Sequence, residues 1–337
     1  AVKLAEEVGV PRVPGSGRVD NPDSARAFAR THGYPVLIKA SAGGGGRGMR
    51  VVRRDEEFIS QLAAAAAEAQ AAFGDPSLYV EKFIERARHI EIQVLGDKHG
   101  NVVHLGERDC STQRRHQKLI EEAPSPVIDA KLRQELADAA VRLARHVGYV
   151  GAGTVEFVFD DDTQRWYFLE MNTRIQVEHP VTEMVTGRDL VIEQIRVAAG
   201  ARISFTQEDV ALSGHAIECR INAEDASANF APRPGRLQTW VAPAGEGVRI
   251  DTHCFPGYRV PPYYDSLLAK IIVHGRDRHE AVQRMQEALG RLQISGVPTT
   301  APFHQQVLAH RDFAGAAVTT RWVEETFLPS LKQAGAA

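Results

Sequence analysis

A stretch of alternating polar side chains, Glu170 to Glu178, carries the residue types needed for chemistry on a charged substrate. If the stretch is extended, its even-numbered positions share one face, because successive side chains of a strand point to opposite sides. That face presents, in order, a carboxylate, an amide, a guanidinium, an amide and a carboxylate. A solvated edge strand is the alternative interpretation, but this face lacks the Lys, Ser and Thr that usually fill one.

The acidic residues of the preceding hairpin predict a divalent cation. If the polar turn at residues 160–164 joins two strands and centres near Thr163, Glu156 lies opposite Glu170. Like charges that are directly opposed across two strands are destabilising, and a bound cation removes that cost. Mg²⁺ prefers a few carboxylate and amide oxygens together with substrate phosphates. We therefore predict a magnesium site at Glu156, Glu170 and Asn172, with a metal-free acidic hairpin as the alternative.

Two further residues of the stretch predict a small anionic substrate. The guanidinium of Arg174 can donate two parallel hydrogen bonds to bicarbonate or phosphate. Glu178 is close enough in sequence to act as a general base on the same anion.

The glycine-rich segment 43–48 matches the pattern G-x-G-x-x-G, but not its usual context. A dinucleotide fingerprint opens a helix, whereas this loop leads into an expected strand beginning at Met49. It is not a Walker loop either, because Met49 and Arg50 stand where Lys and Ser or Thr are required. We predict a flap that lays backbone N–H groups over phosphates, with a flexible hairpin tip that binds nothing as the alternative.

Charged residues at strand ends beside this flap extend the phosphate prediction. Lys39 and Lys82 are expected phosphate contacts, with ordinary surface lysines as the alternative. Glu81 could accept a hydrogen bond from an adenine amino group. The basic segment 113–118 favours anion binding within an active site over RNA binding, because it has no interleaved aromatic residues. A solvated face is its remaining alternative.

Helix and strand signals indicate the elements that position these residues. Asn21 followed by Pro22 is a helix-start signal, and Gly33 is the matching stop. A helix tail is also expected before Gly9. Helices are expected over 22–32, 55–73, 130–146 and 188–199, and strands over 34–40, 49–53, 78–84, 89–96, 102–107, 152–159 and 166–172.

Composition excludes several classes of function. Lys and Arg number 40 and Asp and Glu 43, so a net charge of −3 excludes binding to nucleic acid or anionic membranes by bulk charge. No apolar run approaches the length of a membrane-spanning helix. The widely spaced Cys110, Cys219 and Cys254 fit neither a disulfide framework nor a zinc site, and we expect reduced thiols in a cytosol-like compartment.

Four segments together resemble biotin carboxylase, an ATP-grasp enzyme: residues 39–49, 108–118, 170–183 and 215–225. The resemblance runs from residue 1 to about residue 327. It implies an α+β chain with an ATP-grasp domain at 1–205, whose glycine-rich lid spans about 15–85. A biotin carboxylase C-terminal domain at 206–330 and a frayed tail at 331–337 follow.

The resemblance also implies a reaction and its residues. ATP, Mg²⁺ or Mn²⁺ and bicarbonate form carboxyphosphate, which releases the CO₂ that carboxylates biotin. Glu178 is the implied base, Lys118 stabilises carboxyphosphate, Arg220 stabilises the biotin enolate, and Arg174, Gln176 and Val177 bind bicarbonate. The metal ligands are again Glu156, Glu170 and Asn172. The implied ATP-binding residues are Lys39, Gly45, Gly46, Met49, Glu81, Lys82, Ile84, His89, Gln113, His116, Glu156, Val158, Glu170 and Ile294.

Partners and departures follow from the same resemblance. Implied partners are a biotin carboxyl carrier protein or domain, a carboxyltransferase and a second copy in a homodimer, with no nucleic acid or membrane. The implied location is the cytoplasm, or a mitochondrion or plastid. The sequence differs by a short insertion around 161–163, and it begins after the Rossmann-like domain that opens the family. A nucleotide-binding chain without turnover and another ATP-grasp ligase, such as a carbamoyl-phosphate synthetase, remain alternatives.

Overall fold

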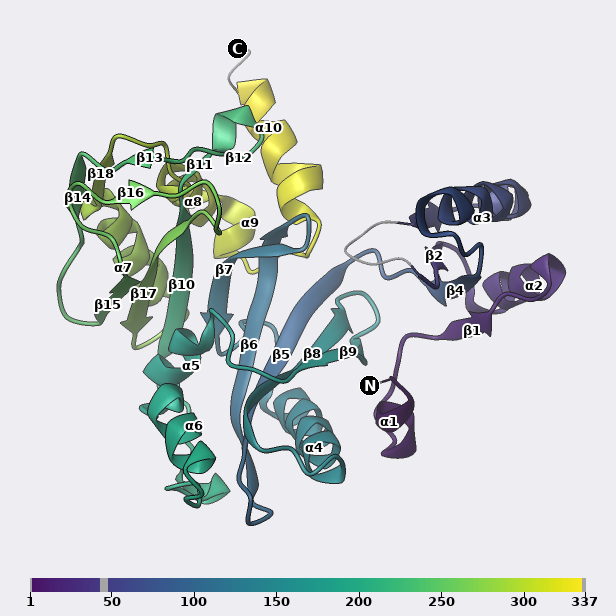
Figure 1. The fold of residues 1–337 in the computed structure, drawn as a ribbon, viewed down its shortest axis with the longest axis horizontal. Coiled ribbons are helices and arrows are strands. Elements are labelled where there is room, and N and C mark those ends of the chain that lie inside the picture. The colour runs from purple at the N-terminus through teal and green to yellow at the C-terminus, as the bar shows by residue number, and fades with distance from the viewer. Residues whose placement is uncertain (1, 43–47, 335–337) are drawn as a thin grey trace. The chain divides into compact units, whose positions relative to one another are not determined.

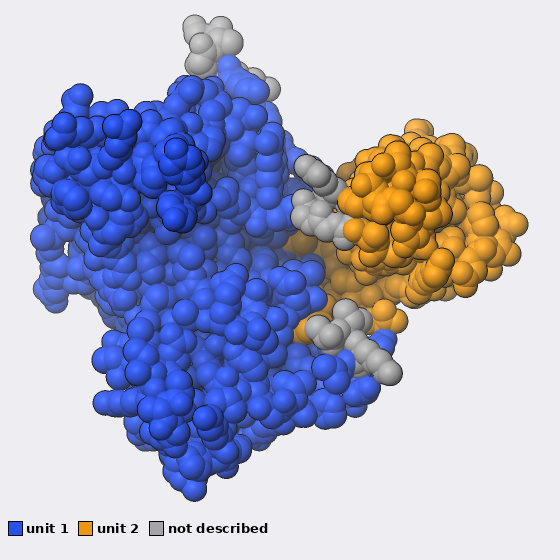
Figure 2. Space-filling view, in the orientation of Figure 1, with its two compact units in different colours: residues 1–10, 88–159, 169–337 blue, residues 11–87, 160–168 orange. Residues whose placement is uncertain are grey.

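The computed structural model describes residues 2–42 and 48–334, and it contains two compact units, coloured separately in Figure 2. Unit 1 comprises residues 1–10, 88–159 and 169–337. Unit 2 comprises residues 11–87 and 160–168.

Unit 2 is a four-stranded antiparallel sheet with two helices packed on it (Figure 1). The side chain of Asn21 accepts a hydrogen bond from the backbone of Asp23 at 2.8 Å, and Gly33 follows the helix with φ +76°, as the sequence predicts. Buried residues of both helices, such as Ala29 and Phe58, share one core with the sheet. In the order β1-β4-β2-β3 the strands are Gly15–Arg18, Leu78–Lys82, Val36–Ala40 and Met49–Val52; the helices are α2 (Pro22–His32), η1 (Asp55–Glu57) and α3 (Phe58–Phe73).

Unit 1 is built on an eight-stranded sheet that carries most of the candidate residues. Its middle strands pair antiparallel, with β5 against β6, β6 against β7, and β7 against β10. The strands are, in the order β15-β17-β10-β7-β6-β5-β8-β9, Val248–Thr252, Leu267–Gly275, His215–Asn222, Gln117–Ala123, Val102–Arg114, Ala87–Gly96, Gly151–Asp160 and Arg165–Asn172.

Helices and short strands surround this sheet. The alternation of β10 shows how the core forms: Ile217, Cys219 and Ile221 join a core with α7 and α8, which leaves Glu218 and Arg220 on the opposite side of the strand. The helices are α1 (Val2–Glu7), α4 (Ala130–His146), α5 (His179–Thr186), α6 (Leu190–Ala198), η2 (Gln207–Asp209), η3 (Ala226–Ala228), α7 (Arg278–Arg291), α8 (Ala301–Ala309), α9 (Arg311–Ala314), η4 (Val323–Phe327) and α10 (Leu328–Ala334). The short strands are β11 (Glu224–Asp225), β12 (Ala231–Pro232), β13 (Gly235–Arg236), β14 (Thr239–Val241), β16 (Arg259–Val260) and β18 (Gln293–Ser295).

Two sequence predictions are wrong in detail. The stretch 170–178 is not one strand, because β9 ends at Asn172 and Glu178 already lies at the N-terminus of α5. Its even positions therefore do not share a face: Arg174 is exposed, whereas Gln176 and Glu178 are buried. Part of the expected frayed tail is helical, because Leu331 of α10 packs against the core of unit 1; residues 335–337 lie outside the described residues.

The main sheet, the cysteines and the helices bear on the predicted domain boundary and on the classes of protein that the composition excluded. The main sheet is continuous across residue 205, since β10, β15 and β17 join strands from earlier in the chain. All three cysteines lie in the described part of the chain, where they are buried and free. No helix among residues 2–42 and 48–334 has the length and apolar character needed to cross a membrane.

Candidate active site

Lys118 on β7 is the centre of a buried charged cluster in unit 1. Its Nζ donates to three carboxylates: to Glu91 at 2.6 Å, to Glu156 at 3.0 Å and to Glu178 at 2.5 Å. Burial alone would lower the pKa of Lys118, but the surrounding carboxylates outweigh it and raise that pKa above the usual lysine range. The ammonium therefore stays charged and holds side chains from three different parts of the chain.

Glu178 is held between two cations. One carboxylate oxygen accepts from Lys118, and the other accepts from Nη2 of Arg220 at 3.0 Å. Arg220 in turn donates from Nε to Glu121 at 2.6 Å. Only 2% of Glu178 is exposed, so the two cations fix its orientation inside the protein rather than in solvent. A carboxylate in this position can take a proton from a substrate that is bound beside Lys118 and Arg220.

Arg108 on β6 supports the cluster from within the sheet. It is fully buried, and it stands directly across from Glu91 in the β5–β6 pairing. Its Nε donates to Glu91 at 2.6 Å, so Glu91 joins Arg108 to Lys118. The rest of the guanidinium donates to Gln93, Thr154, Gln176 and Thr182, at 2.6 to 3.2 Å.

Gln176 and His89 complete the surroundings of Glu156. Gln176, which lies beyond the end of β9, donates to Glu156 at 2.8 Å. The Nε2 of His89 lies 3.3 Å from Glu91 and 3.4 Å from Glu156, although its angles fall outside hydrogen-bond geometry. Burial lowers the pKa of His89, but the two carboxylates prevail and raise it to about 9. Burial likewise raises the pKa of Glu156, but His89 and Lys118 prevail and lower it to about 2.

The predicted metal ligands stand on neighbouring strands at one edge of the sheet. Glu156 is on β8, and Glu170 and Asn172 are on the edge strand β9. The amide of Asn172 lies 3.4 Å from the carboxylate of Glu170, and Glu170 is exposed. Two carboxylates and an amide oxygen, with Glu156 kept ionised, form a donor set that fits Mg²⁺. Arg174 follows, and its Nη1 donates to the backbone of Ile175 at 3.2 Å.

Lys270 on β17 is a site residue that the sequence analysis missed. Its Nζ donates to the backbone oxygen of Val177 at 2.8 Å and lies 3.3 Å from Asp251. Arg108, Glu91 and Glu121 were missed as well. Glu91 and Gln93 alternate with apolar residues, which resembles a solvated face, yet both are fully buried. Only their cross-strand partners reveal that this polar face is internal.

In unit 2 the structure pairs two of the predicted nucleotide-binding residues. Lys39 donates to Glu81 at 2.5 Å across β2 and β4. Lys82 donates to the backbone oxygen of Gly33 at 3.0 Å, and burial lowers the pKa of Lys82. Met49 is exposed and Ile84 is half-buried; Gly45 and Gly46 lie outside the described residues.

The remaining predicted nucleotide contacts lie at separate places in unit 1. Gln113 is buried on β6, and His116 is exposed in the turn before β7, with φ +63°. Val158 is half-buried on β8. Ile294 on β18 is half-buried against the core of the C-terminal half. The basic segment is thus a β-hairpin, of which Lys118 alone enters the charged cluster.

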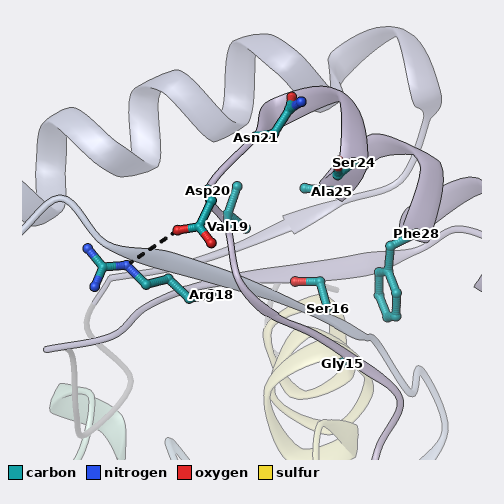
Figure 3. Close-up of a pocket in the computed structure, with 9 residues that line it drawn as sticks. All are labelled: Gly15, Ser16, Arg18, Val19, Asp20, Asn21, Ser24, Ala25 and Phe28. Atoms are coloured by element: carbon teal, nitrogen blue, oxygen red, sulfur yellow. Dashed lines mark ion pairs between the residues drawn. The ribbon is translucent and has the colours of Figure 1, made fainter.

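Two cavities are not lined by any of these residues, although Gly15, which lines the first, is the cross-strand partner of Glu81. One, of about 330 Å³, is in unit 2 between β1 and the start of α2, where Arg18 and Asp20 form an exposed ion pair at 3.8 Å (Figure 3). The other, of about 520 Å³, is in unit 1 and is lined by residues 100–103, Arg145 and residues 202–209. Neither contains a predicted site residue.

Two family models together match most of the chain. Residues 1–206 match the family described as carbamoyl-phosphate synthase L chain, ATP binding domain. Residues 218–325 match the biotin carboxylase C-terminal domain.

Individual relatives are similar over almost the whole chain. Biotin carboxylase 1 of Bacillus subtilis is 55% identical over 96% of this chain and 72% of its own length. The biotin carboxylase of Nostoc is 56% identical over 96% of this chain and 73% of its own. A pyruvate carboxylase component of Methanothermobacter thermautotrophicus is 52% identical over 96% of this chain and 66% of its own. A solved dimer of the biotin carboxylase domain of Hydrogenobacter thermophilus 2-oxoglutarate carboxylase, with MgADP, ADP and bicarbonate, aligns with a TM-score of 0.86. It is 50% identical over 96% of this chain and 71% of its own.

Proposed function

The chain belongs to the biotin carboxylase family, and we propose that its Glu178 is the base that prepares bicarbonate for this ATP-dependent ligase. The enzyme uses ATP and bicarbonate to carboxylate biotin. The observation that carries the proposal is the position of Glu178, whose two oxygens accept from Lys118 and Arg220.

The first proposed step is a proton transfer. Glu178 takes the proton from the O–H of bicarbonate, and the freed oxygen attacks the terminal phosphorus of ATP. Carboxyphosphate forms and ADP leaves. Carboxyphosphate then splits into CO₂ and phosphate. The released phosphate takes the proton from the ureido nitrogen of biotin, and that nitrogen attacks the CO₂.

Lys118 and Arg220 are proposed to stabilise the charge that develops along this route. Preorganised cations in a buried site stabilise developing negative charge more than they would in water. Lys118 would then face carboxyphosphate, and Arg220 the biotin enolate. Because the same cations hold Glu178, each would release part of its interaction with that carboxylate as the substrate charge builds.

The remaining residues are proposed to bind substrates. Arg174, Gln176 and the backbone of Val177 would bind bicarbonate. Mg²⁺ or Mn²⁺ at Glu156, Glu170 and Asn172 would neutralise phosphate charge. The nucleotide contacts proposed in unit 2 are Lys39, Gly45, Gly46, Met49, Glu81, Lys82 and Ile84; those proposed in unit 1 are His89, Gln113, His116, Val158 and Ile294.

Partners and location are also proposals. We propose a biotin carboxyl carrier protein or domain, a carboxyltransferase, and a homodimer, which the dimeric relative supports. We also propose a cytoplasmic location, or a plastid if the source is a plant. The plastid alternative is supported by a Populus trichocarpa relative that is named as chloroplastic and is 53% identical. Relatives named for pyruvate and 2-oxoglutarate leave the final acceptor open.

ADP release from Mg-ATP tests the function, measured with and without bicarbonate and biotin. We expect release that requires both, and a loss of at least about a hundredfold in Glu178→Gln with nucleotide binding retained. Glu135→Gln, an exposed change on α4, is the matched control. Unchanged turnover in Glu178→Gln would remove that residue from its role. Nucleotide binding without release would favour a non-catalytic chain, and release without biotin would favour another ATP-grasp ligase.

A further inference from the structure

Two buried carboxylates face each other behind Arg220. Glu121 on β7 and Glu218 on β10 are direct partners in the antiparallel pairing of these strands. Both residues are fully buried. Opposed side chains have Cβ atoms about 4.5–5.5 Å apart, and like charges there are destabilising.

The hydrogen bonds of this pair are incomplete. One oxygen of Glu121 accepts from Arg220 at 2.6 Å. Within the described residues, the other oxygen of Glu121 and both oxygens of Glu218 are buried without a hydrogen-bond partner. An ionised carboxylate in that situation would be costly, because burial disfavours a charge that nothing compensates.

The neighbouring cations are already engaged. Lys118 donates to Glu91, Glu156 and Glu178. Lys270 donates to the backbone oxygen of Val177 and lies 3.3 Å from Asp251, and Arg220 is shared between Glu121 and Glu178.

Among the described residues, the nearby titratable groups on α5, α8 and β6 are paired elsewhere or favour their neutral form. On α5, Glu183 is paired with Arg249 at 2.6 Å, and burial lowers the pKa of His179. Burial lowers the pKa of His304 on α8 to about 4, so that ring is neutral. The thiols of Cys110 and Cys219 are neutral too, because burial raises their pKa well above the usual range.

We propose that Glu121 and Glu218 hold one proton between them and together position Arg220. The protonated oxygen of Glu218 donates to the free oxygen of Glu121, whose other oxygen accepts from Arg220. The inference rests on the proposed role of Arg220 and deepens it: the pair fixes the guanidinium while adding one negative charge rather than two. Burial raises the pKa of Glu218 well above its ordinary value and that of Glu121 to about 7, in agreement with a retained proton.

The shared proton makes the pair sensitive to alkaline pH. A carboxylate whose pKa is raised on folding holds its proton in the folded state at pH values where the unfolded chain has lost it. Stability therefore falls as pH rises above the ordinary carboxyl range. Loss of the proton also adds a second negative charge beside Arg220, so its field toward a substrate weakens.

Infrared difference spectroscopy of the full chain tests the proton directly. The spectrum of wild type minus Glu218→Gln near neutral pH should contain the C=O band of a protonated carboxylic acid, and the band should shift in deuterium oxide. Glu121→Gln should retain the band, which assigns it to Glu218. The exposed control Glu135→Gln should also retain it. A wild-type spectrum without the band, or one in which Glu218→Gln leaves it unchanged, would overturn the proposal.

The pH dependence of thermal unfolding is the second measurement. The Gln side chain is a neutral isostere that can still donate to Glu121, so Glu218→Gln should unfold at a temperature that falls less steeply with rising pH than wild type. Glu218→Leu, which cannot donate, should lose more stability than Glu218→Gln at neutral pH. If the difference in unfolding temperature between wild type and Glu218→Gln stays constant with pH, that result would contradict a retained proton. Neither measurement needs turnover, so a failure here is distinct from a failure of the proposed catalysis.

Discussion

The replacement Arg108→Lys tests whether the buried guanidinium organises the active site of this biotin carboxylase. Arg108 makes five hydrogen bonds and has no exposed surface. Lysine keeps the positive charge, so Glu91 is not left without a cation. Its ammonium has three donors in place of the five of arginine. At least two of the five acceptors therefore lose their donor.

The expected cost follows from that count. A buried group left without its hydrogen bond costs about 1–3 kcal/mol. Two such groups predict a loss of about 2–6 kcal/mol in the free energy of unfolding. Total stabilities of about 5–15 kcal/mol make this a large fraction that a folded variant can still survive.

Urea unfolding followed by tryptophan fluorescence measures the effect, because Trp240 and Trp322 both lie in unit 1. The matched control is Arg291→Lys, because the side chain of Arg291 is 56% exposed and forms an ion pair with Glu287 on α7. We expect that control to change stability by less than about 0.5 kcal/mol. A change of that small size in Arg108→Lys would refute the reasoning, because the same chemical substitution would then be insensitive to burial.

Two further predictions concern Lys270 and Glu122. Lys270→Met removes the charged hydrogen bond to the backbone of Val177, which is worth about 1.5–3 kcal/mol. We expect KM for bicarbonate to rise roughly ten- to hundredfold, while the Kd for nucleotide stays constant. An unchanged KM for bicarbonate would contradict this prediction. Burial raises the pKa of Glu122, but His215 and Arg278 prevail and lower it to about 2. The difference between this pKa and the ordinary glutamate pKa of 4.5 means that ionised Glu122 stabilises the folded state by about 3 kcal/mol. This stabilisation is complete above about pH 4.5 and is lost as pH falls toward 2. Urea midpoints of wild type and Glu122→Gln should converge on acidification, and a constant gap would exclude this linkage.

Local signals in the sequence determined much of the secondary structure. The Asn21–Pro22 start and the Gly33 stop bound α2, and the apolar spacing of residues 130–146 gives α4 with the predicted ends. The acidic hairpin also forms as predicted, with β8 and β9 adjacent in the sheet. These features depend on neighbours in the chain, so the sequence contains all that is needed to predict them.

Resemblance and residue chemistry named Lys118, Glu178 and Arg220, but spacing could not show what surrounds them. Lys118 and Glu178 are 60 residues apart, and Lys118 and Glu91 are 27 apart. Their meeting is decided by the order of strands in the sheet. The same is true of Arg108 and Lys270, whose residue types are ordinary on a protein surface.

The alternating stretch 170–178 shows the limit most clearly. Period-2 polarity predicts a strand, and the sequence alone offers no reason to end it at Asn172. Gln176 reaches the buried Glu156 and Arg108, and Glu178 reaches Lys118 and Arg220. These contacts satisfy buried charges, which is worth more than extending an edge strand. The sequence therefore determined which chemical groups are present, and the tertiary structure decided which are buried and which partners they have, because burial and hydrogen bonding depend on residues far apart in the chain.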